Sequence, residues 1–332
     1  MSSPTLLVTG VTGFIGFKVL ITALEEGYTV RAAVRSIEKS KTLSSHPKIS
    51  AACQQDKLSF IEITDICREG AYDVALKGIT HVIHLASPLP SPFLDPQAEI
   101  YEPTIKSVKA ILQSALNAPT VRKVVITSSS FANTPFPPDP TTQVTAESRA
   151  PNLSGPFDSM LPAYMAGKVA GLNLTDKFVE ENRPSFSVVN IFPGLVLGRD
   201  DRATSLESLG VGTNAILLGV ITGQSASWPL ASGIAHVSDV AKVHVMALKE
   251  DITKDIGVTT THKFNDAWDI VKKHFPKAVA DGLFTQGDQP TVPSSWDHYQ
   301  NEINLGSDYK TYGDIVVDVA NQYLELYGKE KA

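Results

Sequence analysis

Short apolar runs rich in β-branched residues alternate with segments of helical periodicity over the first ~130 residues of the chain. The helical segments between the runs, Phe17–Glu26 and Pro103–Asn117, place apolar side chains on one face. Strands that alternate with crossover helices are typical of a parallel sheet covered by helices on both faces. The pattern therefore predicts an α/β fold with a Rossmann-type, doubly wound parallel sheet. The predicted strands are Thr5–Val8, Thr29–Val34, Leu58–Ile63, His81–Leu85 and Lys123–Thr127.

The same pattern continues with a long predicted helix at Leu161–Glu181 and a sixth strand at Phe186–Phe192. After Pro193, glycine and serine become frequent and the alternation weakens, so we expect short helices in a smaller C-terminal substrate lobe. Two later segments are clearer: Val237–Leu248 returns to the sheet domain, and Asp314–Tyr327 is an amphipathic closing helix. We expect residues 1–193 plus about 236–248 to form the dinucleotide-binding domain, and about 194–235 plus 249–332 to form the lobe.

The net charge and composition of the chain argue against some classes of binding partner. The 332 residues carry a formal net charge of -6, which argues against nucleic acid or an anionic membrane surface as the main partner. The N-terminus lacks the pattern of a signal peptide, and no segment approaches the ~18 apolar residues of a membrane span. We therefore expect a cytoplasmic protein. Cys53 and Cys67 suggest neither a disulfide framework nor a metal site.

A glycine-rich loop, Thr9–Gly16, joins the first predicted strand to the first predicted helix, which is the context that a dinucleotide-binding turn requires. Gly10 permits the tight turn, Gly13 lets backbone N–H groups approach a pyrophosphate, and Gly16 lets the helix pack closely. The sequence therefore predicts that a dinucleotide cofactor binds here. The loop residues predicted to contact it are Gly10, Thr12, Gly13, Phe14, Ile15 and Gly16.

The residues after the second strand indicate which dinucleotide binds. NAD-specific folds place a carboxylate on the adenosine ribose about 20 residues after the glycine loop. This chain has Arg35 there, with Lys39 close behind, and a guanidinium would pair with the extra 2′-phosphate of NADP. We predict NADP(H), with Arg35 as the main contact, Lys39 as the second and Arg31 as a weaker candidate. Asp65 is predicted either to accept from the adenine amino group, with Ile66 beside it, or to cap a helix.

Tyr164 and Lys168 stand four residues apart in the long predicted helix, so they lie on one face and one turn from each other. A free tyrosine has a pKa of about 10. A nearby lysine cation lowers that pKa, so that the phenol can exchange a proton with a substrate oxygen. Thr127–Ser130 ends the fifth strand, where ligands bind in doubly wound sheets. A serine hydroxyl there can stabilise a carbonyl oxygen, or simply cap the strand.

Together these motifs resemble the extended short-chain dehydrogenases/reductases, especially dihydroflavonol-reductase-like and yeast methylglyoxal-reductase-like carbonyl reductases. The similarity covers almost the whole chain. The matching stretches are Val8–Gly16, Val30–Arg35, His84–Pro88, Val124–Ser129, Tyr164–Lys168, Pro193–Gly198 and His236–Ala241.

The resemblance implies an NADPH-dependent enzyme that reduces an aldehyde or ketone to an alcohol. Hydride would pass from the cofactor to the carbonyl carbon, while Tyr164 protonates the oxygen. Ser129 is implied as the catalytic serine, with Ser128 and Ser130 as alternatives, and Lys168 would hold the nicotinamide ribose. The further cofactor contacts implied are Ala86, Ser87, Thr127, Pro193, Gly194 and Val196.

Three positions depart from the family pattern. Lys106 stands where relatives carry an asparagine that supports a water relay, Gly167 replaces a serine, and Arg199 replaces a proline. Arg199 either faces an anionic substrate group or is solvated. An apolar substrate pocket is predicted, behind an entrance shaped by the segment 136–156. Its candidate lining residues, each of which could equally be core, are Phe93, Phe131, Phe157, Met160, Leu161, Leu195 and Trp228.

Two other functions remain open. An NAD-linked sugar-nucleotide epimerase or a 3β-hydroxysteroid-dehydrogenase-like enzyme would share the fold and the Ser-Tyr-Lys set, although Arg35 counts against the epimerase. A non-catalytic dinucleotide-sensing regulator would share the fold alone, but the chain keeps both Tyr164 and Lys168. We expect a small-molecule carbonyl substrate, and we favour a monomer over a dimer.

Overall fold

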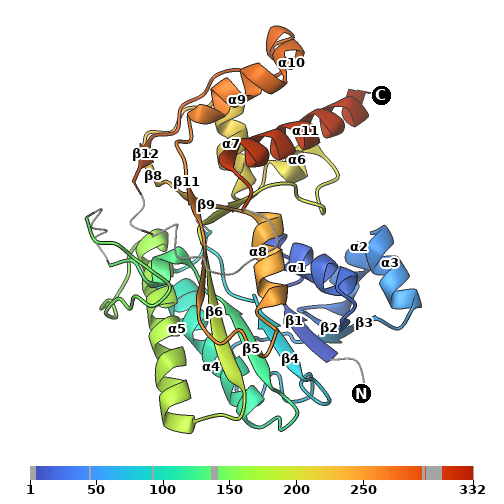
Figure 1. The fold of residues 1–332 in the computed structure, drawn as a ribbon, viewed down its shortest axis with the longest axis vertical. Helices are drawn as coiled ribbons and strands as arrows, with labels where there is room; N and C mark the ends of the chain where they lie inside the picture. The colour runs from blue at the N-terminus through green and yellow to red at the C-terminus, as the bar shows by residue number, and fades with distance from the viewer. Residues whose placement is uncertain are drawn as a thin grey trace. The chain divides into compact units, whose positions relative to one another are not determined.

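The computed structural model describes residues 5–44, 46–91, 93–135, 141–293, 296 and 309–331. The chain divides into two compact units (Figure 1). The sheet unit comprises Met1–Asp139, Val144–Phe192 and Ala241–Gly257, and the second unit comprises Pro140–Gln143, Pro193–Val240 and Val258–Ala332. Residues 249–257, which we expected in the substrate lobe, belong to the sheet unit because a late strand joins the large sheet.

The sheet unit is built on seven strands in the order β10-β6-β5-β4-β1-β2-β3. The pairs β1/β2, β1/β4, β2/β3, β4/β5 and β5/β6 are parallel. This is the strand order of a Rossmann-type sheet, so the predicted fold class is confirmed. The strands are β1 (Thr5–Thr9), β2 (Thr29–Val34), β3 (Leu58–Glu62), β4 (His81–His84), β5 (Lys123–Thr127), β6 (Ser187–Pro193) and β10 (Ile256–Val258).

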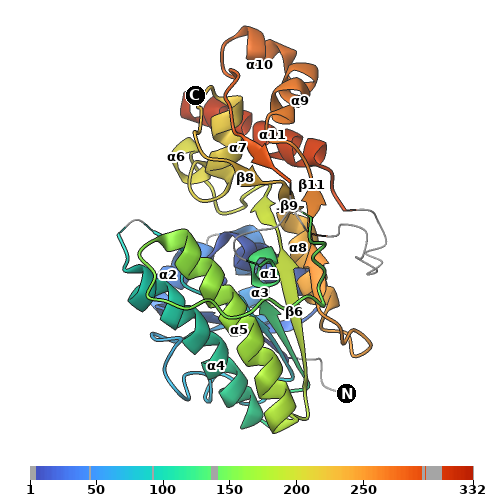
Figure 2. The same ribbon diagram turned by 90° about the vertical axis from the view of Figure 1, so that its left-hand side faces the viewer.

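Helices cover the sheet because its strands are apolar on both sides. The helices α4 and α5 lie side by side over one face (Figures 1 and 2). There Ile111 and Phe178 are buried in one cluster with Leu7, Val82 and Val124 from the strands. The helices are α1 (Phe14–Glu25), α2 (Ile37–Ser44), α3 (Pro47–Gln54), α4 (Glu102–Leu116) and α5 (Met160–Asn182), with the π-helical turn η1 (Pro96–Tyr101) leading into α4.

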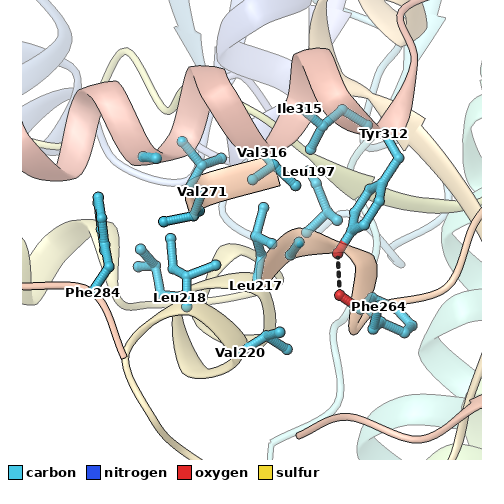
Figure 3. Packing of buried hydrophobic residues seen from close by; sticks show 14 of the residues in the cluster. Leu197, Leu217, Leu218, Val220, Phe264, Val271, Phe284, Tyr312, Ile315 and Val316 are labelled. Atoms are coloured by element: carbon cyan, nitrogen blue, oxygen red, sulfur yellow. Dashed lines mark hydrogen bonds between the residues drawn. The ribbon is translucent and has the colours of Figure 1, made fainter. Parts of the chain in front are cut away.

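The second unit has its own core, formed around α7 and α11 (Figure 3). Leu217, Val271 and Ile315 are fully buried in it, and the Tyr312 hydroxyl donates to the Phe264 carbonyl at 2.9 Å. Its helices are α6 (Leu206–Leu209), α7 (Asn214–Ile221), α9 (Asp266–His274), α10 (Pro276–Ala280) and α11 (Tyr312–Lys331). Its strands are β7 (Leu195–Leu197), β9 (Gly233–His236) and β11 (Thr260–Thr261) in one sheet, and β8 (Leu230–Ala231) and β12 (Thr291–Val292) in another. Helix α8 (Val237–Met246) runs from this unit into the sheet unit.

None of the helices in the described ranges combines the length and the apolar character that a membrane span needs. The same residues contain no group of three or more His, Cys, Asp or Glu side chains placed to hold a metal ion. Both cysteines are unpaired and partly buried.

Candidate active site

The structure brings Ser129, Tyr164 and Lys168 together at the carboxyl end of β5. Tyr164 and Lys168 lie one turn apart near the start of α5, and the Lys168 amine is 5.7 Å from the centre of the Tyr164 ring. The amine also donates to the Thr127 carbonyl at 3.4 Å. Ser129 precedes a short 3-10 turn, η2 (Ser130–Ala132). Its hydroxyl accepts from the Phe131 N–H at 3.3 Å and lies close enough to the Tyr164 phenol to lower the pKa of that group.

The neighbouring serines occupy different environments. The Ser128 backbone N–H donates to the Ile191 carbonyl at 2.8 Å, which holds this residue in the sheet. Ser130 begins η2, and its carbonyl accepts from the Thr134 hydroxyl at 2.8 Å. Ser129 is the serine whose hydroxyl influences the pKa of the Tyr164 phenol.

Burial sets the ionisation of the cluster. It raises the pKa of Tyr164, and the hydrogen bond from Ser129 offsets that rise only in part. Burial also lowers the pKa of Lys168 to about 8. The sequence predicted that Lys168 lowers the pKa of Tyr164. In the structure the net pKa of Tyr164 is raised instead, because desolvation of the phenolate is the largest influence on it. At neutral pH the phenol is protonated and Lys168 is mostly a cation.

Beside this cluster lies a buried hydrogen-bonded group that the sequence analysis did not identify. The Thr9 hydroxyl oxygen accepts from the backbone N–H groups of Leu85 and Ala86 at 3.0 Å each. It also lies 3.0 Å from Nδ1 of His84. Since Thr9 accepts twice, we assign its own proton to His84 Nδ1, so that the neutral ring carries its hydrogen on Nε2. Burial, assisted by Lys168, lowers the pKa of His84 to about 3. The one sequence signal was a histidine at the end of a buried strand.

Two positions of the glycine loop, Gly10 and Gly16, have no room for a side chain. Gly10 has a φ of +73°, and a Cβ there would lie 2.9 Å from the Ala86 nitrogen. A Cβ on Gly16 would lie 2.1 Å from the Gly10 carbonyl oxygen. Gly13 precedes α1, whose first turn has neither a capping side chain nor an acidic residue. Uncapped N–H groups at a helix start fit an anion such as a pyrophosphate, so this loop fits a dinucleotide.

At the end of β2, Arg35 is exposed, and within the described part of the chain it forms no hydrogen bond or ion pair. Arg31 is committed elsewhere, since its guanidinium donates to the carbonyls of Ala75 at 2.7 Å and Lys77 at 2.9 Å. Lys39 lies in α2, but its side chain is outside the described structure.

Asp65 and Ile66 follow β3. The Asp65 carboxylate accepts from the Cys67 N–H at 2.8 Å. Turns rather than a helix follow it, so the helix-cap alternative is wrong and Asp65 instead closes a local turn. Ile66 is partly buried against the core of the sheet unit.

The remaining predicted contacts lie in two places. Ala86 and Ser87 form the loop after β4, held to the glycine loop through Thr9. Pro193, Gly194 and Val196 belong to the second unit. A Cβ on Gly194 would lie 2.7 Å from the Gly233 carbonyl oxygen, so glycine is required for the close approach of β9.

The three departures from the family pattern have structural explanations. Lys106 is exposed and pairs with Glu102 at 2.8 Å. A Cβ on Gly167 would lie 3.1 Å from Cβ of Thr104, so the glycine lets α5 approach α4. Arg199 is neither free in solvent nor available to a substrate, because its guanidinium pairs with the Glu325 carboxylate at 2.5 and 3.1 Å.

The residues predicted to line the substrate pocket lie in different environments. Phe131 lies edge-on to the Tyr164 ring with centroids 6.5 Å apart, and Phe157 packs against Tyr101. Leu195 is partly buried and packs against the second unit's core. Phe93, Leu161 and Trp228 are exposed, and Met160 is partly buried at the start of α5. The first part of the predicted entrance segment, residues 136–140, lies outside the described residues.

A network of ion pairs and hydrogen bonds, called the ionic brace below, joins α5 to β6. Arg149 donates to Asp176 of α5 at 2.5 Å and to Asp255 at 2.8 Å. Asp255 in turn accepts from the backbone and side-chain nitrogens of Asn190 in β6 at 2.7 and 3.1 Å. The helix that carries Tyr164 and Lys168 is thereby tied to the strand beside β5.

Residues 6–258 match the NAD dependent epimerase/dehydratase family. The chain is 33% identical to Ketoreductase CTB6 of Cercospora beticola, over 100% of this chain and 98% of that protein. It is 35% identical to NAD-dependent epimerase/dehydratase ALT6 of Alternaria alternata, over 82% of each. Among solved structures, yeast methylglyoxal/isovaleraldehyde reductase Gre2 complexed with NADPH superposes with a TM-score of 0.80 at 25% identity, covering 98% of this chain and 99% of that one.

Proposed function

Since the chain belongs to the NAD dependent epimerase/dehydratase family, we propose that it is an NADPH-dependent carbonyl reductase that converts an aldehyde or ketone to an alcohol. The observation that carries the proposal is the cluster at the end of β5. There the Tyr164 phenol, whose pKa burial raises, lies next to Ser129, and the Lys168 amine lies 5.7 Å from the centre of its ring. The similarity to a named ketoreductase and to an NADPH-bound reductase supports reduction over epimerisation.

NADPH, when bound, supplies the hydride that reaches the carbonyl carbon. The fit of the glycine loop to a pyrophosphate and the uncommitted guanidinium of Arg35 support this cofactor. The residues proposed to hold it are Gly10, Thr12, Gly13, Phe14, Ile15, Gly16, Arg35, Lys39, Asp65, Ile66, Ala86, Ser87, Thr127, Tyr164, Lys168, Pro193, Gly194 and Val196.

In the proposed mechanism, three side chains have different roles at the substrate oxygen. Tyr164 gives its phenolic proton to that oxygen as negative charge develops on it. Ser129, which lies next to the Tyr164 phenol, donates to the same oxygen and stabilises the charge. Lys168 stabilises the phenolate that remains, because its cation lies beside the ring.

The test follows NADPH and NADH consumption over a panel of aldehydes, α-ketoesters and aryl ketones, with Tyr164→Phe in parallel. We expect turnover with NADPH and a loss of at least about 100-fold in kcat in the variant, the usual worth of a positioned acid. Tyr28→Phe is the matched control, and it should leave kcat unchanged. Tyr28 lies just before the amino end of β2, whereas the candidate site lies at the carboxyl end of β5.

Other outcomes would replace the proposal. Full activity in Tyr164→Phe would remove the phenol from the mechanism. NAD that copurifies with the protein would favour the epimerase alternative. Binding of NADPH without turnover of any carbonyl would favour the dinucleotide-sensing regulator.

A further inference from the structure

A carboxylate reaches the turn after β2 from the neighbouring strand. Glu62 is the last residue of β3, and the sheet register pairs it with Val34, the residue before Arg35. Its Oε2 accepts from the backbone N–H of Ile37 at 3.0 Å. The Glu62 carboxylate therefore lies against the turn that joins β2 to α2, and Arg35 is part of that turn.

The other charged side chains that the structure describes near this turn already have partners. Glu38 and Lys41 pair with each other at 2.6 Å on the exposed side of α2. Arg31 is held by two backbone carbonyls. Arg35 and Glu62 are both exposed, and in the described structure they form no ion pair with each other. Among the side chains that the structure describes, the turn thus presents one uncommitted cation and one carboxylate; the Lys39 side chain lies outside the described structure.

These two charges act in opposite directions on a 2′-phosphate placed at the turn. The guanidinium of Arg35 attracts it, whereas the carboxylate of Glu62 repels it and occupies the Ile37 N–H that a phosphate would use. A ribose 2′-hydroxyl, as in NADH, meets no such repulsion and can donate to a carboxylate. NAD-specific folds obtain that carboxylate from the end of the second strand; in this chain the third strand brings a carboxylate to the turn.

We propose that Glu62 determines the cofactor selectivity of this enzyme: it weakens the binding of 2′-phosphorylated dinucleotides and keeps NADH usable. Arg35 sets the preference for NADPH, and Glu62 limits it. The proposal depends on the proposed function in one respect: the enzyme must bind NADPH or NADH with the adenosine at this turn.

Glu62→Gln is the informative substitution, because glutamine keeps an oxygen that can accept from Ile37 while the negative charge is lost. Dissociation constants for 2′,5′-ADP, 5′-ADP, NADPH and NADH are measured by calorimetry on the full chain. We expect 2′,5′-ADP and NADPH to bind roughly 3- to 10-fold more tightly, as for one exposed charge nearby. Binding of 5′-ADP should stay unchanged, and NADH should bind equally or less tightly.

Glu38→Gln is the matched control, since it removes one negative charge from the same helix start but leaves Glu62 in place. It should change the affinity for 2′,5′-ADP by less than about twofold. Arg35→Ala should weaken 2′,5′-ADP and leave 5′-ADP unchanged. Melting temperatures establish that each variant is folded.

Unchanged or weaker binding of 2′,5′-ADP by Glu62→Gln would overturn the proposal, and so would an equal gain in Glu38→Gln. Absence of 2′,5′-ADP binding in every variant would also overturn it. If 2′,5′-ADP binding tightens as expected while no carbonyl is reduced, the selectivity role stands and the reductase function fails.

Discussion

At the scale of single residues, the Lys168 amine shows how burial and charge compete in this site. The side chain is buried near the start of α5, and the amine reaches one carbonyl oxygen, that of Thr127. Desolvation disfavours the cation and lowers the pKa of Lys168 to about 8. The proposed mechanism needs the cation, so its ionisation limits the alkaline side of the activity profile.

We expect kcat/KM for NADPH, which reports the free enzyme, to fall as pH rises through about 8. The sign follows from the direction of the shift: above its lowered pKa, Lys168 is neutral and can no longer stabilise a phenolate. In Lys168→Arg the residual activity should show no such fall at about pH 8, because a guanidinium, with a pKa above about 12, stays protonated. A profile measured from pH 6 to 10 that is unchanged in this variant would assign the alkaline limb to another group.

At the scale of secondary-structure elements, the approach of α5 to α4 depends on glycine. A Cβ at Gly167 would lie 3.1 Å from Cβ of Thr104, while one at Gly171, one turn on, would lie 3.7 Å from Val108. At the first distance Thr104 must move by a few tenths of an ångström, whereas the second distance is an ordinary contact. The two positions therefore form a matched pair in one helix.

Gly167→Ala should lower the free energy of unfolding by about 1–2 kcal/mol, since overpacking outweighs the gain in helix propensity. Gly171→Ala should raise it by about 0.5–1 kcal/mol, since propensity acts alone. Denaturant titration of both variants measures the difference. Equal effects at the two sites would show that α4 and α5 are not in close contact at Thr104.

The ionic brace of α5 gives a second prediction at this scale. The Asp255 side chain is 13% exposed and the Arg149 side chain 32%, so Arg149→Ala leaves a largely buried carboxylate without its cation. We expect a loss of about 2–4 kcal/mol of unfolding free energy. Arg122→Ala is the control, because its contact with Glu250 is long, at 3.9 Å, and exposed. It should cost less than about 0.5 kcal/mol, and a similar loss in both variants would contradict the role of the brace.

The elements were predictable where their signal is local. The ranges of β2 and β5 coincide with those expected, and α4 and α5 start and end within a residue of the expected ranges. The helix α1 starts three residues earlier than expected, at Phe14, because Gly13 opens the helix. The short helices α2 and α3 were not predicted. Helices of this length are stabilised by tertiary packing rather than by propensity, so their local pattern is weak.

At the scale of the whole molecule, the two units have separate hydrophobic cores. Ile315 of α11 is fully buried in the core of the second unit. Ile315→Ala should reduce the hydrogen-exchange protection of α7, α9 and α11 by about 2–5 kcal/mol. The amides of β1, β4 and β5 should keep theirs. An equal loss in the central sheet would show that the two cores unfold as one.

The sequence by itself determined the doubly wound sheet, the glycine loop and the one-turn spacing of Tyr164 and Lys168, because each depends on periodicity or on residues near one another in the chain. It also identified the serine segment after the fifth strand, although the local pattern did not decide which of the three serines acts on the substrate. Only the tertiary structure decided that Ser129 lies near enough to influence the pKa of the phenol and that β10 joins the large sheet. It also decided that Arg199 pairs with Glu325 and that Glu62 reaches the turn beside Arg35. These contacts join residues far apart in sequence. The ionisation of Tyr164 and Lys168 depends in the same way on burial, which no local pattern contains.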